Sequence, residues 1–328
     1  MKKAVVVGGS NGIGLAIVNS LTDREYFVYI LDVKAPEPSL LSLGSRTQHI
    51  YCDLLAYDEQ IFEELCKDTD IDLLMITAGF GRVADFEYLH ISEIHNLLMV
   101  NTVAGIKIIR NFYDRIKSAA PFYTGMMGSI AGLVSSPMFS VYAASKAGIC
   151  RFIESVNIEL ETGGFQNRIL NVSPGSIKGT RFNGGDNDMS KTHELAESIV
   201  DALFDRKELL IPEYKEIYKG VLERYRTDAH LFGISSYNYK KASGRAFSES
   251  RIKIGYYICE SEESGGKLMK KIADMKKQCD YLIVHANKVS PDQKAILQNC
   301  RLVDRIDESD DLQSAKSRWG YHILFTDS

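Results

Sequence analysis

The stretch from Lys3 to Leu15 constrains the fold more than any other part of the chain. Lys3-Ala-Val-Val-Val7 is a short apolar run, which is typical of a strand buried on both faces. Gly8, Gly12 and Gly14 follow, and helical periodicity begins at Leu15. A strand, a glycine-rich turn and a helix in this order predict the first unit of an α/β fold whose turn approaches a ligand closely.

The glycine-rich turn predicts a pyrophosphate site, because backbone N–H groups at a helix N-terminus can approach phosphates there. The next strand, residues 26–31, ends in Asp32. A carboxylate at that place can accept hydrogen bonds from the ribose hydroxyls of NAD and would repel a 2′-phosphate, so we expect NAD(H) to be favoured over NADP(H). The alternative is an ordinary turn residue at a strand end. The turn residues expected to bind the dinucleotide are Gly8, Ser10, Asn11, Gly12, Ile13 and Gly14.

Strand and helix signals alternate as far as about residue 225. Strands are expected over 49–52, 71–76, 123–127, 168–172 and 208–212, and helices over 58–67, 91–117 and 143–160. This alternation predicts a Rossmann-like doubly wound parallel sheet with helices on both faces. Ligands of such sheets bind at the carboxyl ends of the strands. The candidate residues that stand at those ends are Gly8, Asp32, Asp53, Gly79, Ser129 and Pro174.

A tyrosine and a lysine share one face of the helix expected over 143–160. Tyr142 stands one helical turn before Lys146, so the two side chains are neighbours on the helix surface. An ammonium beside a phenol lowers the cost of the phenolate, which would let Tyr142 exchange a proton near neutral pH. Ser129 follows an expected strand, and its hydroxyl could lie beside the phenol. A tyrosine and a lysine at this spacing are commonly just surface residues, so the interpretation depends on the other motifs in the chain.

Further motifs surround this pair. Val7–Gly14 is similar to a Thr-Gly-x-x-x-Gly-x-Gly cofactor loop, Asp53-Leu54 to an adenine-contacting pair, and Ile76–Gly79 to Asn-Asn-Ala-Gly. Pro174-Gly175 matches the turn after a sixth strand. Asn101, Ser129, Tyr142 and Lys146 match a catalytic tetrad. Together, over about residues 1–225, these motifs resemble the short-chain dehydrogenase/reductase family.

The resemblance implies hydride transfer at nicotinamide C4, with Tyr142 giving a proton to a carbonyl or taking one from an alcohol. It implies that Lys146 binds the nicotinamide ribose and lowers the pKa of Tyr142, that Ser129 holds the substrate oxygen, and that Asn101 keeps a water in a proton path. The residues implied to contact the cofactor outside the glycine-rich turn are Asp32, Asp53, Leu54, Ala78, Gly79, Tyr142, Lys146, Pro174, Gly175, Ile177 and Thr180.

Two departures from the family pattern concern the bracing of the cofactor loop. Val7 replaces the usual threonine, and Ile76-Thr77 replaces the usual asparagine pair. We therefore expect the loop and the fourth strand to lack the side-chain hydrogen bonds that normally hold them.

The substrate pocket is expected to be bordered by Phe80, Arg82, Met138, Phe139 and residues 176–190, with residues 183–188 as a lid. Arg82, Lys178 and Arg181 could bind a phosphate or a nucleotide-sugar diphosphate, although charged side chains are more often simply solvated. We expect an NAD(H)-dependent oxidoreductase that interconverts an alcohol and a carbonyl, with a sugar, an alditol or a nucleotide-sugar as one class of substrate. The alternatives are a non-catalytic dinucleotide sensor or scaffold, and the reductase half of a bifunctional glycan-assembly protein.

Composition excludes several other classes. The chain has 328 residues, 45% hydrophobic and 25% charged, and a net charge of −4, which gives no general attraction to nucleic acid or to anionic membranes. The six cysteines are scattered without metal-ligand spacing, so we expect no metal and a reduced, cytoplasmic setting. The resemblance implies a homodimer or homotetramer that pairs through residues 102–117 and 143–161.

A second segment follows the first domain, which we place at residues 1–228. Residues 229–250 are polar and turn-rich and predict a linker, and 251–328 show a fresh strand–helix alternation. The order of this small α/β domain resembles the first half of a GT-A-fold glycosyltransferase, with Asp327 where an Asp-x-Asp metal motif would begin. A docking or dimerising appendage is the alternative. We expect no glycosyl transfer, because one carboxylate cannot hold a metal–diphosphate as two do.

Overall fold

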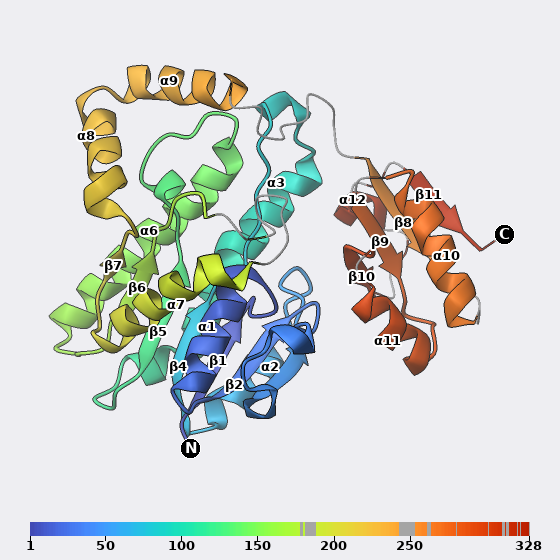
Figure 1. The fold of residues 1–328 in the computed structure, drawn as a ribbon, viewed down its shortest axis with the longest axis horizontal. Coiled ribbons are helices and arrows are strands. Elements are labelled where there is room, and N and C mark those ends of the chain that lie inside the picture. The colour runs from blue at the N-terminus through green and yellow to red at the C-terminus, as the bar shows by residue number, and fades with distance from the viewer. Residues whose placement is uncertain are drawn as a thin grey trace. The chain divides into compact units, whose positions relative to one another are not determined.

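The structure is a computed structural model of the chain, and it describes residues 1–177, 180, 188–242, 253–260, 264–279, 281–300, 302–309, 312, 315–319, 321 and 323–327. The chain forms two compact units (Figure 1). The first contains Met1–Val83 and Asn96–Ala246, and the second contains Ala84–His95 and Phe247–Ser328.

A seven-stranded parallel sheet forms the centre of the first unit, with the order β3-β2-β1-β4-β5-β6-β7. The strand order reverses between β1 and β4, and this switch point is where parallel α/β sheets bind ligands. The prediction of a Rossmann-like doubly wound sheet is therefore confirmed. The strands are β1 (Lys3–Val7), β2 (Phe27–Asp32), β3 (Thr47–Tyr51), β4 (Ile71–Ile76), β5 (Tyr123–Met127), β6 (Ile169–Val172) and β7 (Leu209–Leu210).

Helices cover both faces of this sheet, and each face has its own apolar core. On one face Phe62 of α2, Ile108 of α4 and Ile153 of α6 pack against the strands, and on the other Ile17 of α1 and Ile199 of α7 do so. Burial of apolar surface on both faces explains why the central strands read as continuous apolar runs. The helices of the first unit are α1 (Gly12–Asp23), α2 (Glu59–Lys67), α4 (Ala104–Asn111), α5 (Tyr113–Ile116), α6 (Ser140–Thr162), α7 (Met189–Phe204), α8 (Lys219–Thr227) and α9 (Ala229–Ala242), and α3 (Ile91–Leu98) spans the division between the two units at His95.

The helix predicted over 91–117 is interrupted. The structure divides it into α3, a π-helical turn at Met99–Val103, α4 and α5. The wide turn carries Asn101, whose buried amide bonds to backbone outside the helix. Single π-helical turns of this kind are frequent at functional sites.

The linker predicted over 229–250 is wrong for its first part, because residues 229–242 form α9 and belong to the first unit. Asp228 accepts a hydrogen bond from the backbone N–H of Leu231 (2.9 Å), which satisfies one donor of the first turn. The ring of Phe232 lies 5.6 Å from that of Tyr225 in α8. The polar composition of this segment suggested a linker. The cap by Asp228 at the N-terminus of α9 and the packing of Phe232 against α8 are enough to form a helix. Residues 243–250 lie outside the described part of the chain.

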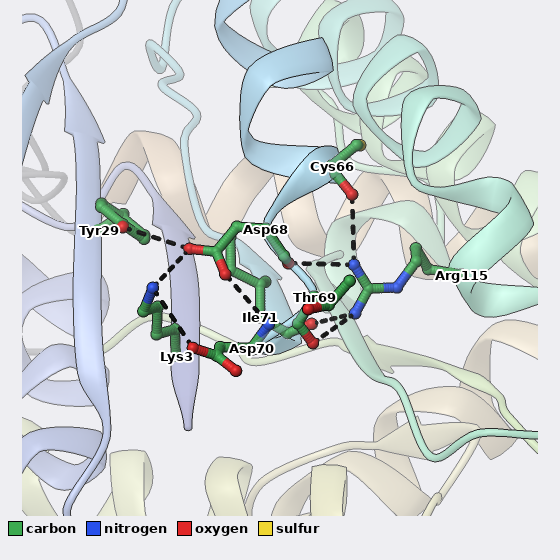
Figure 2. Close-up of polar contacts among 8 residues, drawn as sticks. All are labelled: Lys3, Tyr29, Cys66, Asp68, Thr69, Asp70, Ile71 and Arg115. Atoms are coloured by element: carbon green, nitrogen blue, oxygen red, sulfur yellow. Dashed lines mark hydrogen bonds and ion pairs between the residues drawn. The ribbon is translucent and has the colours of Figure 1, made fainter. Parts of the chain in front are cut away.

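The guanidinium of Arg115 fixes the loop between α2 and β4. Figure 2 shows it donating to the carbonyl oxygens of Cys66 (3.3 Å), Asp68 (3.2 Å), Thr69 (3.3 Å) and Ile71 (2.5 Å). In the same loop the Asp68 carboxylate accepts a hydrogen bond from the ammonium of Lys3 (2.7 Å). These contacts lie at the amino ends of β1 and β4, at the opposite end of the strands from the switch point.

The second unit contains a smaller parallel sheet of four strands in the order β10-β9-β8-β11. Its core brings together Tyr257, Leu268, Ile272, Leu282 and Leu297. This confirms a second, smaller α/β segment. Its elements are β8 (Ile254–Ile258), α10 (Gly265–Lys276), β9 (Tyr281–His285), α11 (Pro291–Asn299), β10 (Arg305–Asp307), α12 (Ala315–Trp319) and β11 (Ile323–Thr326).

Asp327 follows β11, as the sequence predicts, and its carboxylate is engaged within the second unit. It accepts hydrogen bonds from the hydroxyl of Tyr257 (2.6 Å) and the backbone N–H of Glu260 (2.9 Å), and it pairs with Lys271. The resemblance of this unit to a glycosyltransferase stays a prediction.

Two negative findings apply to the residues that the structure describes. None of the helices there has both the length and the apolar content needed to cross a bilayer. No group of His, Cys, Asp and Glu side chains in that part of the chain could hold a metal ion.

Candidate active site

The turn after β1 is shaped so that two of its positions require glycine. Gly8 has a φ of +85°, and a Cβ on it would lie 2.5 Å from the backbone nitrogen of Ala78. A Cβ on Gly14 would lie 2.2 Å from the carbonyl oxygen of Gly8. The backbone of β1, the first turn of α1 and the end of β4 therefore approach one another more closely than side chains would allow. This cradle fits the pyrophosphate of a dinucleotide.

Thr77 braces this cradle, which corrects the expectation that the loop lacks side-chain hydrogen bonds. Its hydroxyl lies 3.0 Å from the carbonyl oxygens of both Val7 and Gly8 and donates to them. Thr77 can reach them because β4 runs beside β1 with Val7 opposite Ile76. The family motif places an amide here, and a threonine hydroxyl supplies a brace from the same strand end.

Asp32 lies at the end of β2, beside the glycine-rich turn, as predicted. Its carboxylate accepts a hydrogen bond from the backbone N–H of Ser10 (3.1 Å), and the hydroxyl of Ser10 donates to the carbonyl oxygen of Lys34. Burial raises the pKa of Asp32, while the hydrogen bonds from Ser10 act in the opposite direction. The carboxylate thus holds the turn in place at the end of β2.

The next two predicted cofactor residues lie close by. The backbone N–H of Cys52 donates to the carbonyl oxygen of Asp32 (3.2 Å), which brings the Asp53-Leu54 pair to the end of β2. Both members of the pair are buried. The Asp53 carboxylate accepts a hydrogen bond from the N–H of Leu55 (2.8 Å), so it shapes its own turn.

Asn101 is held by hydrogen bonds on both sides of its amide. Its oxygen accepts from the backbone N–H of Phe80 (3.0 Å), and its nitrogen donates to the carbonyl oxygen of Phe80 (2.9 Å) and to the hydroxyl of Ser145 (3.1 Å). A Cβ on Gly79 would lie 3.1 Å from the Asn101 oxygen and 3.2 Å from the Lys146 ammonium. The side chains of Asn101 and Lys146 therefore both lie against the backbone of Gly79.

Ser129, Tyr142 and Lys146 form one polar group at the carboxyl end of β5. Ser129 precedes the 3₁₀ turn Ile130–Gly132, where its oxygen accepts from the N–H of Ala131 (3.2 Å) and its hydroxyl donates to the carbonyl oxygen of Pro174 (3.5 Å). It lies close enough to the phenol of Tyr142 to lower the pKa of that group. The Lys146 ammonium donates to the carbonyl oxygen of Met127 (2.8 Å) and lies 5.7 Å from the centre of the Tyr142 ring. The structure therefore brings together all four residues predicted as a tetrad.

The electrostatics of this group differ from the expectation. Burial raises the pKa of Tyr142 to about 12, and the hydrogen bond with Ser129 lowers that pKa by less than burial raises it. Burial also lowers the pKa of Lys146 to about 8. In the protein chain alone, Lys146 therefore does not hold the pKa of Tyr142 below its usual value. Both groups are 8% exposed or less, and removal from water disfavours the charged form of each.

A loop covers the ring of Tyr142. The ring of Phe139 lies 4.3 Å from it, and a Cβ on Gly81 would lie 2.7 Å from the tyrosine ring. Met138, just before Phe139, is buried and has a φ of +63°, which is uncommon for a residue with a side chain. This covering is the reason that burial dominates the pKa of the phenol.

The turn after β6 completes the group of predicted residues. The carbonyl oxygen of Pro174 accepts the N–H of Ile130 (3.0 Å), and Thr180 donates to the carbonyl oxygen of Ile177 (3.2 Å). A Cβ on Gly12 would lie 3.6 Å from Thr180, so Thr180 lies beside the glycine-rich turn. Among the predicted substrate contacts, Lys178, Arg181 and residues 183–187 lie outside the described part of the chain.

Sequence reasoning missed two contributors to the site. The hydroxyl of Tyr218 would lie 1.5 Å from a Cβ on Gly175, so it fills the space that this glycine leaves. Ser145 lies between Asn101 and the backbone of α6, because its hydroxyl donates to the carbonyl oxygen of Tyr142 (2.7 Å) and accepts from Asn101. The contact between Ser145 and the Tyr142 backbone could have been found from their spacing on one helix. Nothing in the sequence indicated that Tyr218 lies against Gly175.

Comparisons with known proteins identify the family. The family profile for short chain dehydrogenase matches residues 2–191. The uncharacterized oxidoreductase TDA5 of Saccharomyces cerevisiae is 29% identical over 187 residues, which cover 55% of this chain and 56% of that protein. The dehydrogenase RED2 of Cochliobolus heterostrophus is 30% identical over 160 residues, which cover 48% and 60%. The chain thus spans less than two thirds of the length of these curated relatives.

Solved structures show the same fold. A short-chain dehydrogenase from Streptomyces avermitilis superimposes with a TM-score of 0.57 at 20% identity, over 74% of this chain and 98% of that one. A short-chain dehydrogenase from Sphingobium yanoikuyae, solved in complex with NADPH, gives a TM-score of 0.56 at 20% identity, over 70% and 96%. The profile match over residues 2–191, more than half of the chain, shows that the chain belongs to the short-chain dehydrogenase/reductase family of oxidoreductases, and the seven-stranded sheet agrees with it.

Proposed function

We propose that the first unit is an NAD(H)-dependent oxidoreductase that interconverts an alcohol and a carbonyl, with Tyr142 as its acid and base. The observation that carries this proposal is the gathering of Ser129, Tyr142 and Lys146 at the carboxyl end of β5, where the Lys146 ammonium lies 5.7 Å from the centre of the Tyr142 ring and Ser129 lies close enough to lower the pKa of the phenol. A bound nicotinamide supplies or accepts the hydride at the substrate carbon. The residues of the chain then have to hold the substrate oxygen and move one proton.

In the reducing direction, Tyr142 gives its phenolic proton to the carbonyl oxygen, and Ser129 orients that oxygen by a hydrogen bond. In the oxidising direction the proton moves in reverse, from the alcohol to the phenolate form of Tyr142. A pKa of about 12 keeps the phenol protonated at neutral pH, which suits the reducing direction. Lys146, with a pKa lowered to about 8, can return a proton to the site near neutral pH. Asn101 is a positioning residue, because it holds the backbone at Phe80.

The proposed preference for NAD(H) rests on Asp32. Its carboxylate already accepts a hydrogen bond from Ser10 and stands at the end of β2, where a 2′-phosphate would meet a second negative charge. The fold alone does not fix this preference, because the Sphingobium yanoikuyae structure of the same fold contains NADPH. The test is a fluorescence titration with NADH and NADPH; tighter binding of NADPH would contradict the role of Asp32.

Tyr142→Phe tests the chemistry. We expect the variant to lose about 10²–10⁴-fold in kcat for any ketone or alcohol that the wild type turns over, because it removes only the acid–base group. Its affinity for NADH should stay close to that of the wild type. Tyr113→Phe in α5 removes a phenol outside this group and is the matched control, with unchanged kcat. Full turnover by Tyr142→Phe would defeat the mechanism, and absence of turnover by the wild type on sugars, polyols and ketones would favour a dinucleotide sensor.

A further inference from the structure

Tyr218 lies against the turn that follows β6, although it comes after β7 in the chain. A Cβ on Gly175 would overlap the hydroxyl oxygen and the Cζ of Tyr218 and would lie 3.1 Å from its Cε1. These are the three atoms nearest to that Cβ, and all of them belong to Tyr218. Gly175 does not have a positive φ, so the tyrosine ring, and not the backbone angles, is what requires a glycine at this position.

The path of the chain after β7 brings Tyr218 to this place. β7 pairs in parallel with β6, and the N–H of Ser173 donates to the carbonyl oxygen of Leu210 (2.8 Å), so both strands end at the same edge of the sheet. Glu213 then turns the chain with a φ of +55°, and the π-helical turn Tyr214–Tyr218 follows. Backbone conformations that are rare for residues with side chains, and π-helical turns, both occur frequently at functional sites.

Tyr218 is the inward-facing residue of this π-helical turn. It is half-buried, whereas Tyr214 is 42% exposed and Ile217 is 47% exposed. The backbone N–H groups of Ile217 (2.9 Å) and Tyr218 (3.3 Å) both donate to the carbonyl oxygen of Glu213, which holds the backbone of the turn. The turn therefore presents one aromatic ring to Gly175 and its other residues to solvent.

The turn that Tyr218 contacts also holds Ser129. The carbonyl oxygen of Pro174 accepts hydrogen bonds from the backbone N–H of Ile130 (3.0 Å) and from the hydroxyl of Ser129 (3.5 Å). Ser129 in turn lies close enough to Tyr142 to affect its phenol. A continuous series of contacts thus runs from Tyr218, through the Pro174-Gly175 turn, to the proposed acid–base residue.

We propose that Tyr218 is a positioning residue of the reaction, which keeps the Pro174-Gly175 turn, and with it the Ser129 hydroxyl, in place for the substrate oxygen. This rests on the function proposed above. Without the ring, the turn could move into the space that the ring now fills, and a shift of about 1 Å in a catalytic group can cost about 100-fold in rate. Tyr218 lies beyond the segment matched by the family profile, residues 2–191, so this role belongs to a part of the chain that the profile does not describe.

The first test compares kcat among variants of the full chain, with any carbonyl compound that the wild type reduces and well below the unfolding temperature of each variant. Tyr218→Ala should lower kcat about 10–100-fold. Tyr218→Phe keeps a ring against Gly175 and should stay close to the wild type. Tyr214→Ala removes the same side chain from an exposed place in the same turn, so it is the matched control with unchanged kcat. Wild-type kcat in Tyr218→Ala, or equal losses in Tyr218→Ala and Tyr218→Phe, would overturn the proposal.

Ser129→Ala separates positioning from a general effect on the fold. If Tyr218 acts through Ser129, Tyr218→Ala should lower kcat by less than about twofold in a Ser129→Ala background, because the group that it positions is already gone. A merely structural role would give the same loss in both backgrounds, and that result would show that Tyr218 does not position Ser129.

Gly175→Ala tests the contact itself. The new methyl group would overlap the ring of Tyr218, so this variant alone should lower kcat about as much as Tyr218→Ala does. In the double variant the methyl group occupies the space that the ring has left, and kcat should be no lower than in Tyr218→Ala alone. A further loss in the double variant would show that the contact with Tyr218 is not what Gly175 serves, and the proposal would be wrong.

Failure of the proposed function gives a different result. If the wild type reduces no carbonyl compound, urea denaturation of the same variants still tests the positioning. The effects of Tyr218→Ala and Ser129→Ala on the unfolding equilibrium constant should then depart from a simple product by at least about twofold, because residues in one network of contacts are coupled. Such coupling would support the positioning of Ser129 without the chemistry, and a simple product would overturn it.

Discussion

Lys146 shows at the scale of one residue how burial sets the chemistry of the site. Its side chain is 2% exposed, and its ammonium donates to the carbonyl oxygen of Met127. Burial lowers its pKa to about 8, so at neutral pH the lysine stays protonated at a cost in stability. The protein thus keeps a positive charge next to a phenol that is itself buried and neutral.

This cost predicts a pH dependence of stability. The pKa of Lys146 is about 8 in the folded chain and about 10.5 in the unfolded chain, so the unfolded state binds more protons between these values. The free energy of unfolding should therefore gain up to about 3 kcal/mol from this residue as the pH rises from about 8 to about 10.5. Lys146→Met should lack that gain, which urea denaturation at several pH values would measure.

The matched control is Lys107→Met, which removes an ammonium that lies over the ring of Tyr57. Its unfolding free energy should follow the wild-type profile between pH 8 and 10.5. An equal rise with pH in Lys146→Met and in the wild type would show that Lys146 is not the group that titrates.

The sequence predicted the placement of Tyr142 and Lys146, but it did not predict the pKa of Tyr142. Helical spacing placed Tyr142 and Lys146 on one face, and the structure confirms it. The direction of the Tyr142 pKa was wrong, because it depends on the cover formed by Phe139 and Gly81. Packing between a loop and a helix leaves no periodic signal in the sequence.

At the scale of elements, strands and helices with strong patterns were predicted well, and their ends and interruptions were not. The strands of the first sheet lie within a few residues of their predicted places, because apolar runs buried on both faces are easy to recognise. The π-helical turn at Met99–Val103 and the helix at Ala229–Ala242 were missed. Both depend on hydrogen bonds and packing with distant segments, which local propensity does not contain.

Arg115 gives a prediction about how one element is attached to another. Its guanidinium donates to four carbonyl oxygens, from Cys66 at the end of α2, through Asp68 and Thr69 in the loop, to Ile71 at the start of β4 (Figure 2). Arg115→Lys should lower the free energy of unfolding by about 1–3 kcal/mol, because an ammonium cannot reach all four acceptors. Chemical denaturation measures this loss, and kcat should be unchanged because the network lies at the far end of the strands from Tyr142.

Arg110→Lys in α4 is the control for this change, since it makes the same substitution on a neighbouring helix. Its unfolding free energy should match that of the wild type. Equal stability of the Arg115 and Arg110 variants would show that the four carbonyl contacts contribute little.

At the scale of the whole molecule, each of the two units has a core of its own. The sequence foretold two α/β segments because the strand–helix alternation restarts after residue 250. It placed the first boundary too early, because α9 is polar in composition. The pairing of copies through the segments 102–117 and 143–161 stays a prediction.

The only tryptophan of the chain, Trp319, provides a probe for one unit alone. It is buried in the second unit, where its indole N–H donates to the Asp307 carboxylate (2.8 Å). NAD at a hundred times its Kd should stabilise the first unit by about 2.7 kcal/mol and so raise the temperature of one calorimetric transition. The unfolding transition that Trp319 emission reports should keep its temperature. A shift of both transitions would show that the units unfold together.

The strand order also has a consequence for biosynthesis. β1 is made first and lies between β2 and β4, so a ribosome releases an interior strand of the sheet before either of its neighbours exists. Val5, Val6 and Val7 stay without a partner strand until β2, and then β4, leave the exit tunnel. The second sheet repeats this order, with β8 made first and placed between β9 and β11. The nascent chain must therefore keep an apolar strand from pairing wrongly twice during its synthesis, and chaperones act on exposed segments of this kind.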